Sequence, residues 1–168
     1  MISLDRLVVE PLGRHHDRAA FSCGNPSLDL YLRRQAGQDV RRRVARVFVA
    51  RGDEPSRILG FYTLSALSIE GTGLPAAMAR KLPRHPLPAA LVGRLAVDLS
   101  HQGRRIGSCL LVDALQRTLA ASETIAVFAM VVDAIDDSAK AFYASFGFEA
   151  FLDRPMRLFL PLASAEKR

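Results

Sequence analysis

The balance of apolar and polar residues changes several times along the chain, and each change marks a predicted element. Residues 4–10, 44–50 and 57–69 are rich in β-branched and aromatic side chains, which is typical of strands. The turn residues at 52–56 (GDEPS) join the second and third of these strands into a hairpin. The first half of the chain is therefore expected to contribute three strands to a sheet.

One amphipathic segment predicts the first helix, over residues 25–39. Asn25 can cap this helix, and Pro26 suits its first position because a proline there loses no hydrogen bond. Apolar side chains recur every three or four residues, so one face of the helix should be buried. That face consists of Leu28, Leu32 and Ala36, with Tyr31 and Gln35 beside them.

The second half of the chain alternates strands with helices after an irregular connection. Glycines and prolines interrupt residues 71–90, where only a short helix near 76–81 is expected. Asp137 can cap the last helix and Gly147 can end it. The elements predicted after the connection are a strand at 95–97, a helix at 104–121, a strand at 124–132, a helix at 137–147 and strands at 148–151 and 156–160.

This order of elements predicts the fold class. Two strands that are joined through a helix lie parallel and cross over in the right-handed sense. We therefore predict a mixed α/β (α+β) fold with a mostly antiparallel sheet, a parallel β-α-β core and helices on both faces. The chain of 168 residues suits a single domain spanning residues 1–168.

Composition narrows the functions that this fold serves. No apolar run approaches the roughly 20 residues that cross a bilayer, and the chain starts without a signal-peptide core, so we expect a cytoplasmic protein with no membrane contact. Two cysteines and the lack of C-x-x-C or H-x-x-x-H spacing predict no metal site. The net charge of +6 favours an anionic partner such as nucleic acid or a nucleotide, although a well-solvated surface is an alternative.

Residues 92–112 (VGRLAVDLSHQGRRIGSCLLV) carry the most specific signal in the chain. An apolar strand runs into a polar turn, and glycines and arginines follow at the start of a helix. The free N–H groups of a first helical turn and the helix dipole together favour an anion there. The segment therefore predicts a site for a phosphate or pyrophosphate, with an ordinary arginine-rich helix start as the alternative.

Three features make the chain similar to the GNAT (GCN5-related N-acetyltransferase) superfamily. These are the segment just described, the helix AKAFYASFGFE at 139–149, and the order of elements over almost the whole chain. The block FSCGNPSLDLYLRRQAGQD at 21–39, followed by RVFVA at 46–50, further resembles the tRNA-acetylating GNAT toxins of type II toxin–antitoxin systems. The resemblance implies a GNAT fold and an enzyme that uses acetyl-CoA to acetylate the amino group of aminoacyl-tRNA, which blocks translation. It also implies a ribbon-helix-helix antitoxin as partner.

One residue departs from the usual family loop, which reads Gln/Arg-x-x-Gly-x-Gly/Ala. Gln102 and Gly107 match its first and last positions, but Arg105 stands where glycine is usual. An arginine with a positive φ would cost about 1 kcal/mol or more. We expect instead that Arg105 lies in the first turn of a right-handed helix, where its N–H points at phosphate and its side chain adds charge.

The resemblance and the chemistry of acetyl transfer together nominate the site residues. Tyr143 is expected to be the general acid, because an ordinary tyrosine pKa near 10 keeps it protonated and able to donate to the departing thiolate. No histidine is a compelling general base, and an α-amino group with a pKa near 8 leaves open whether one is needed. Main-chain groups would hold acetyl-CoA, with added charge from two arginines: Leu95, Ala96, Val97, Gln102, Gly103, Arg104, Arg105, Ile106, Gly107 and Ser108.

Clustered arginines are the candidates for contact with charged tRNA. Any one of them is as well explained as a solvated side chain, but their density at 33–46 favours nucleic acid. A homodimer would present a broad basic groove to such a substrate. The candidates are Arg33, Arg34, Arg41, Arg42, Arg43, Arg46, Arg84 and Arg94, with Lys81 near the irregular connection.

Two alternatives remain open at this point. A GNAT enzyme can instead acetylate a small-molecule amine or a protein N-terminus. The fold can also persist as a non-catalytic module that binds acyl-CoA or nucleic acid.

Overall fold

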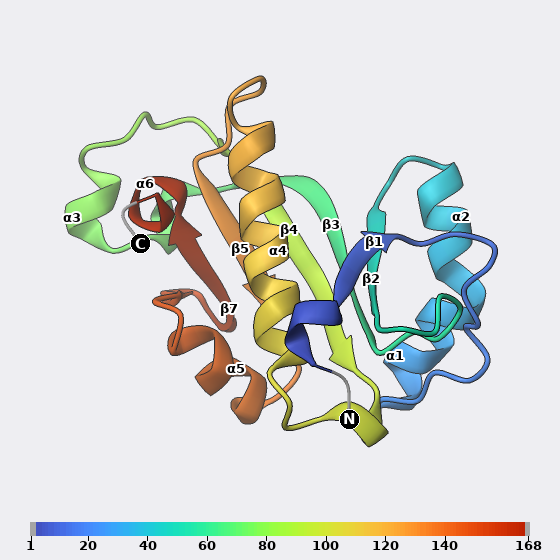
Figure 1. Ribbon diagram of the computed structural model, residues 1–168. Helices are drawn as coiled ribbons and strands as arrows, with labels where there is room; N and C mark the ends of the chain where they lie inside the picture. Colours follow the sequence, from blue (N-terminus) through green and yellow to red (C-terminus); the bar gives the residue numbers. More distant parts are fainter. Residues whose placement is uncertain (1–2, 167–168) are drawn as a thin grey trace. The chain divides into compact units, whose positions relative to one another are not determined.

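The computed structural model describes residues 3–166, whose strands form a mixed sheet of seven in the order β1-β2-β3-β4-β5-β7-β6 (Figure 1). The strands are β1 (Val8–Pro11), β2 (Arg46–Arg51), β3 (Gly60–Ile69), β4 (Leu87–Val97), β5 (Ala129–Asp133), β6 (Glu149–Phe151) and β7 (Arg154–Pro161). The helices are α1 (Pro26–Leu30), α2 (Ala36–Arg41), α3 (Ala76–Ala79), α4 (Ile106–Ala121), α5 (Asp137–Ala144) and α6 (Leu162–Ala165). A π-helical turn, η2 (Tyr31–Gln35), links α1 to α2, and short 3-10 turns are η1 (Leu4–Arg6), η3 (Gly71–Gly73) and η4 (Leu99–His101).

The chain divides into two compact units, and β3, β4 and α4 contribute residues to both. The first unit contains the residues up to Ser65 and Arg94–Ala114. The second unit contains Ala66–Gly93 and the residues from Leu115 onward.

In the first unit, helices cover both faces of the strands, as predicted. Phe61 pairs with Val49 and Tyr62 pairs with Phe48 across the antiparallel β2–β3 ladder, so the two pairs face opposite sides. Phe61 and Val49 pack in one core cluster with the buried side chains of α1 and α2, which lie beside β2 in Figure 1. On the other face, the Tyr62 hydroxyl donates to Asp113 Oδ2 of α4 at 2.6 Å.

The first helical segment buries the face that its sequence predicts. Leu28, Leu32, Ala36 and Tyr31 are each at most 7% exposed, whereas Gln35 is exposed. Asn25 caps the segment as expected, since its side chain accepts from the N–H groups of Ser27 and Leu28. The sequence pattern did not predict the π-helical turn in the middle of this segment.

In the second unit, β4 and β5 form the predicted parallel pair. Ala89 to Val92 align with Ala129 to Val132, and β7 and β6 extend the sheet with antiparallel pairs. Val131 and Phe159 lie in the core of this unit, and both are fully buried. The mixed α/β class and its mostly antiparallel sheet with one parallel pair are therefore confirmed.

Several predicted boundaries were wrong for local reasons. The strand predicted at 4–10 begins only at Val8, because Leu4–Arg6 forms a 3-10 turn that Ser3 caps. The connection predicted at 71–90 already contains the start of β4, where Leu87 begins the strand.

Two further boundaries differ in the second unit. The strand predicted at 124–132 begins at Ala129, since the N–H groups of Thr124 and Ile125 bond to Ala121 and close the end of α4. Asp136 rather than Asp137 caps α5, and its side chain accepts from the Ala139 N–H at 2.8 Å.

Among residues 3–166, none of the helices is both long enough and apolar enough to span a bilayer.

Candidate functional site

The connection between β4 and α4 is an exposed loop whose backbone turns twice into the left-handed region. Gly103 has a φ of 78° and Arg105 a φ of 64°, while Arg104 between them does not have a positive φ. Alternation of this kind lines up successive N–H groups into a concave nest that binds anions. The helix follows at once, with its first-turn N–H groups free of partners inside the helix.

The expectation for Arg105 was therefore wrong. Arg105 does not lie in the first turn of the helix, because α4 begins at Ile106 and Arg105 is left-handed. This residue occupies the conformation that glycine usually takes, at a cost of about 1–2 kcal/mol. Its exposed side chain still adds positive charge to the loop, as expected.

Asp98 anchors the start of this loop to a distant segment of the first unit. Its Oδ1 accepts from the Ser22 N–H at 3.1 Å, and its Oδ2 accepts from the N–H and the hydroxyl of Ser100. Burial raises the pKa of the Asp98 carboxyl, but the hydrogen bonds from Ser100 and Ser22 outweigh burial and hold the pKa below its usual range. The carboxylate is thus ionised and fully used in holding the loop.

Gln102 supports the same loop through its side chain. Its Nε2 donates to the carbonyl oxygens of Cys23 at 3.1 Å and Val97 at 3.0 Å. The side chain is therefore a structural tie, and the residue's main chain remains available to a ligand. The sequence placed Gln102 in the loop but did not indicate its bonds to these two carbonyl oxygens.

The strand segment that precedes the loop lies against β3. An added Cβ on Gly60 would come within 2.8 Å of the Ala96 carbonyl oxygen and 2.9 Å of Leu110. Glycine is therefore the residue that lets β3 approach the end of β4 this closely. The Leu59 carbonyl also accepts the Asp98 N–H at 2.8 Å, which fixes the point where the strand ends.

The predicted cofactor-binding residues form two runs of the first unit, 95–97 and 102–108, separated by residues 98–101. Ala96 and Ile106 are buried in the core, so only their main-chain groups can meet a ligand. Leu95, Val97, Gly107 and Ser108 are half-buried, and Gln102, Gly103, Arg104 and Arg105 are exposed.

Tyr143 lies in α5 of the second unit, and only 3% of its surface is exposed. Its ring packs edge-on against Phe142 and tilted against Phe148, with centroid distances of 5.3 and 5.9 Å. Burial, with a further contribution from the negative charge of Asp133, raises the Tyr143 pKa well above its ordinary value. The phenol is therefore protonated at every physiological pH.

Asp133, whose negative charge acts on Tyr143, forms an ion pair with Arg157. Asp133 at the end of β5 accepts two bonds from the Arg157 guanidinium on β7, at 2.7 and 3.0 Å. The bidentate pair raises the Arg157 pKa. The sequence did not single out either residue, since they meet only through the β5–β7 register.

Seven of the eight predicted tRNA-contacting arginines lie in the first unit. Six of them are exposed on the run from the π-helical turn to the start of β2, and one of these, Arg43, has a φ of 62°. Arg94 is half-buried in β4, and Arg84 lies in the second unit, exposed before β4. The two non-glycine residues with positive φ among residues 3–166 are thus both arginines within predicted phosphate-binding segments.

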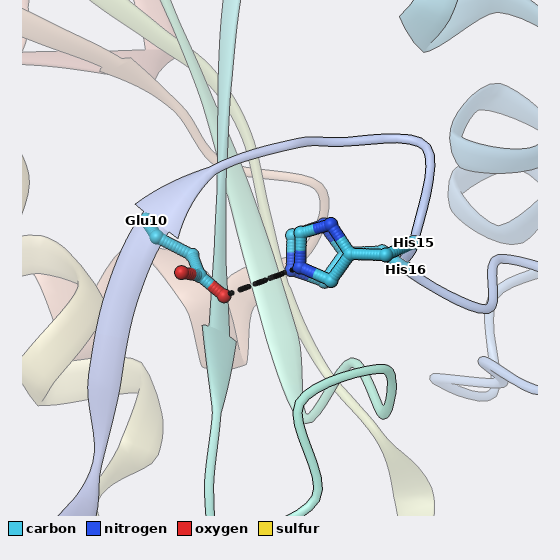
Figure 2. Close-up of side chains that lie close together, drawn as sticks. All are labelled: Glu10, His15 and His16. Carbon is cyan, nitrogen blue, oxygen red and sulfur yellow. Dashed lines mark hydrogen bonds and ion pairs between the residues drawn. The ribbon is translucent and has the colours of Figure 1, made fainter.

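One group among the described residues has the donor atoms of a metal site, namely Glu10, His15 and His16 (Figure 2). The Gly13 N–H donates to His16 Nδ1 at 2.9 Å, so the ring proton lies on Nε2 and faces Glu10 Oε1 at 3.0 Å. Arg51 Nε donates to the same oxygen at 2.8 Å. A metal ion would displace the ring proton and lie against a guanidinium, so we interpret the group as a hydrogen-bonded ion pair. The absence of a metal site remains a prediction from the sequence.

Comparison with known proteins identifies the family. Residues 43–150 match the model of the acetyltransferase (GNAT) domain. A protein of Mycobacterium tuberculosis (strain ATCC 25618 / H37Rv) named "tRNA-acetylating toxin" is 40% identical over 89% of this chain and 88% of its own length.

Solved structures agree with this match. AtaT complexed with acetyl-methionyl-tRNAfMet has a TM-score of 0.90 and 30% identity, covering 96% of this chain and 98% of that chain. A tyrosine-to-phenylalanine mutant of AtaT, bound to the C-terminus of the antitoxin AtaR and acetyl-CoA, has a TM-score of 0.83 and 29% identity, covering 97% and 98%. The chain belongs to the GNAT acetyltransferase family and is an N-acetyltransferase that uses acetyl-CoA.

Proposed function

We propose that this enzyme is a toxin that acetylates the amino group of aminoacyl-tRNA and thereby blocks translation. The observation that carries the substrate assignment is the run of exposed arginines between 33 and 46, which belongs to the same unit as the loop proposed to bind the pyrophosphate. A single-stranded, polyanionic acceptor end suits that charge better than a small amine does. The 40% identity to a protein named tRNA-acetylating toxin supports the same substrate.

The loop fits the pyrophosphate of acetyl-CoA. The left-handed turns at Gly103 and Arg105 present main-chain N–H groups, and the start of α4 adds its unpartnered amides and dipole. A Cβ on Gly103 would meet no atom within 4 Å, so the loop borders open space at this residue. Leu95 to Val97 would pair with the pantetheine arm through main-chain hydrogen bonds.

Two requirements of acetyl transfer can be assigned to this chain, namely stabilisation of the thioester oxygen and protonation of the departing sulfur. Acetyl-CoA supplies the acetyl group as a thioester. A main-chain N–H of the Leu95–Val97 strand donates to the thioester oxygen, a preorganised contact worth roughly 3–4 kcal/mol in acyl transfer. Tyr143 donates its phenolic proton to the sulfur that leaves. Its raised pKa keeps the phenol protonated in the resting enzyme.

The acceptor amine needs no base from the protein under this proposal. The α-amino group of an aminoacyl ester is partly neutral at pH 7, because its pKa lies near 8, whereas a lysine amine is almost entirely charged. The ammonium formed by the attack loses one proton to solvent, which gives the neutral amide, and the Tyr143 phenolate regains a proton from solvent.

The solved structures of relatives also suggest partners for this chain. Relatives are seen with an antitoxin and with acetylated tRNA, and we propose that this chain also pairs with an antitoxin, of the ribbon-helix-helix type. We further propose a homodimer and a cytoplasmic location.

Cell-free translation tests the proposed function. Addition of the protein with acetyl-CoA should stop translation, and omission of acetyl-CoA should leave translation intact. Fresh aminoacyl-tRNA added after removal of the enzyme should restore synthesis. Tyr143→Phe serves as the matched control, since it keeps the buried ring and removes only the hydroxyl. Undiminished translation with the active wild-type enzyme would refute the proposal.

A further inference from the structure

Arg94 lies in an unusual stack within the first unit. Its Cζ is 3.6 Å from the centroid of the Tyr31 ring, close enough for a strong cation–π contact. The Tyr31 ring also stacks with Phe61, at 6.4 Å between centroids and 14° between planes. Tyr31 is 3% exposed, so its ring is an interior platform on which the guanidinium lies.

One hydrogen bond holds the Tyr31 ring in place, and another holds the main chain of Arg94. The Tyr31 hydroxyl donates to Asp39 Oδ2 at 2.8 Å, which links the π-helical turn to α2. Burial, followed by this bond to a carboxylate, raises the Tyr31 pKa, so the ring stays a neutral phenol. The main-chain N–H of Arg94 donates to Thr63 Oγ1 at 3.1 Å, which fixes the arginine in the strand. The guanidinium is therefore held by its face.

The N–H groups of the Arg94 guanidinium have no ion-pair partner among the described residues, 3–166. A guanidinium that stacks through its face still has five N–H donors in its plane, arranged to bind a phosphate through two oxygens. Partial burial of a charged side chain without an ion-pair partner costs free energy of folding, and a bound anion would offset that cost.

The position of Arg94 in the chain indicates which anion it meets. Arg94 directly precedes the Leu95–Val97 segment that is proposed to receive the acetyl-CoA arm, and strand residues advance only about 3.3 Å each. A phosphate bound there would lie close to the acetyl group and the amine that attacks it. The phosphates nearest to that amine belong to the single-stranded acceptor end of a tRNA.

We propose that Arg94 binds a phosphodiester of the tRNA acceptor end and that Tyr31 positions it for that role. This inference rests on the proposed function. Tyr31 acts through Arg94 and touches no reacting atom, so it is a positioning residue.

Acetylation kinetics with bulk aminoacylated tRNA and labelled acetyl-CoA test the inference. Arg94→Gln should raise KM for tRNA about tenfold and leave KM for acetyl-CoA within about twofold. It should also lower the slope of log affinity against log salt by about 0.7, the share of one single-stranded phosphate. Arg94→Lys, which keeps the charge without the planar fork, should fall between Arg94→Gln and the wild type. Arg14→Gln is the matched control, because it removes one exposed arginine outside the proposed set.

Variants of the platform separate positioning from general stability. Tyr31→Phe keeps the ring face and should retain the wild-type KM for tRNA, whereas Tyr31→Leu should raise it about fivefold. In the Arg94→Gln background, Tyr31→Leu should cause no further rise in KM for tRNA, because both changes remove the same contact between Arg94 and Tyr31. Thermal unfolding of each variant shows whether it is folded.

Two outcomes would overturn the inference about Arg94 and leave the proposed function intact. A wild-type KM and salt slope for Arg94→Gln would show that Arg94 meets no phosphate. An equal rise in KM for tRNA and acetyl-CoA would show a general disturbance of the strand. If the wild-type enzyme itself labels no tRNA, the proposed function fails, and that result is distinct from both.

Discussion

The left-handed backbone of Arg105 leads to a prediction in which stability and cofactor affinity change in opposite directions. Arg105→Gly removes a strain of about 1–2 kcal/mol but makes the unfolded chain more flexible by about 0.5–1 kcal/mol. From the midpoints of these two ranges, the net gain in folding free energy should be about 0.75 kcal/mol. For a chain of this length that gain raises Tm by roughly 1–4 °C.

The same change removes a positive charge from the proposed pyrophosphate site. Loss of one charge-assisted contact of about 1.4 kcal/mol should raise KM for acetyl-CoA about tenfold. Arg105→Lys keeps both the charge and the strain, so its Tm and KM should stay near wild type. Thermal unfolding and steady-state kinetics on the three proteins measure both effects.

Arg43 provides a matched control for this experiment. Among residues 3–166 it is the other left-handed arginine, with a φ of 62°, and it follows α2, far along the chain from the loop. Arg43→Gly should raise Tm by a similar amount without changing KM for acetyl-CoA. A fall in Tm for Arg105→Gly, or an unchanged KM, would refute the reasoning about the loop.

Three further outcomes follow from the structure. Tyr143→Phe should lower kcat about 100-fold or more with unchanged KM for acetyl-CoA, and the wild-type rate should show no loss from Tyr143 ionisation up to pH 10, because its pKa is raised. Gly60→Ala should destabilise the fold by about 1–3 kcal/mol in thermal unfolding and raise KM for acetyl-CoA, since the added Cβ collides with Ala96 and Leu110. Glu10→Gln should lower Tm at pH 7 by a few degrees. Hydrogen bonds from His16 and Arg51 outweigh burial and lower the pKa of Glu10 in the folded protein below its usual value of about 4.3. The Glu10 carboxylate therefore stabilises the fold fully at a pH above that usual value. This contribution to the free energy of unfolding disappears as the pH falls through the lower pKa of the folded state. A Glu10→Gln deficit that persists at pH 2 in chemical unfolding would contradict this assignment.

Local patterns predicted those parts of the molecule that local physics determines. The burial of Leu28, Leu32 and Ala36 follows from helical spacing, and the parallel β4–β5 pair follows from the intervening helix. The strand–loop–helix junction at 92–112 was also predicted from its glycines and arginines, and its role in binding an anion stays a prediction.

The features that sequence reasoning missed depend on partners far along the chain or on backbone angles. Asp98 bonds to Ser22, 76 residues away, and no local pattern indicates that contact. Arg94 meets Tyr31 only because a π-helical turn and a strand of the first unit lie together. Arg105 was predicted to be helical because arginine suits a first helical turn, whereas the loop requires a left-handed residue there.

Transfer of label from acetyl-CoA to bulk aminoacylated tRNA is the most direct test of the central claim. The account predicts label on aminoacylated tRNA and none on deacylated tRNA, with mild alkali releasing it as an N-acetyl amino acid. Label on proteins or small amines, with none on tRNA, would contradict the account.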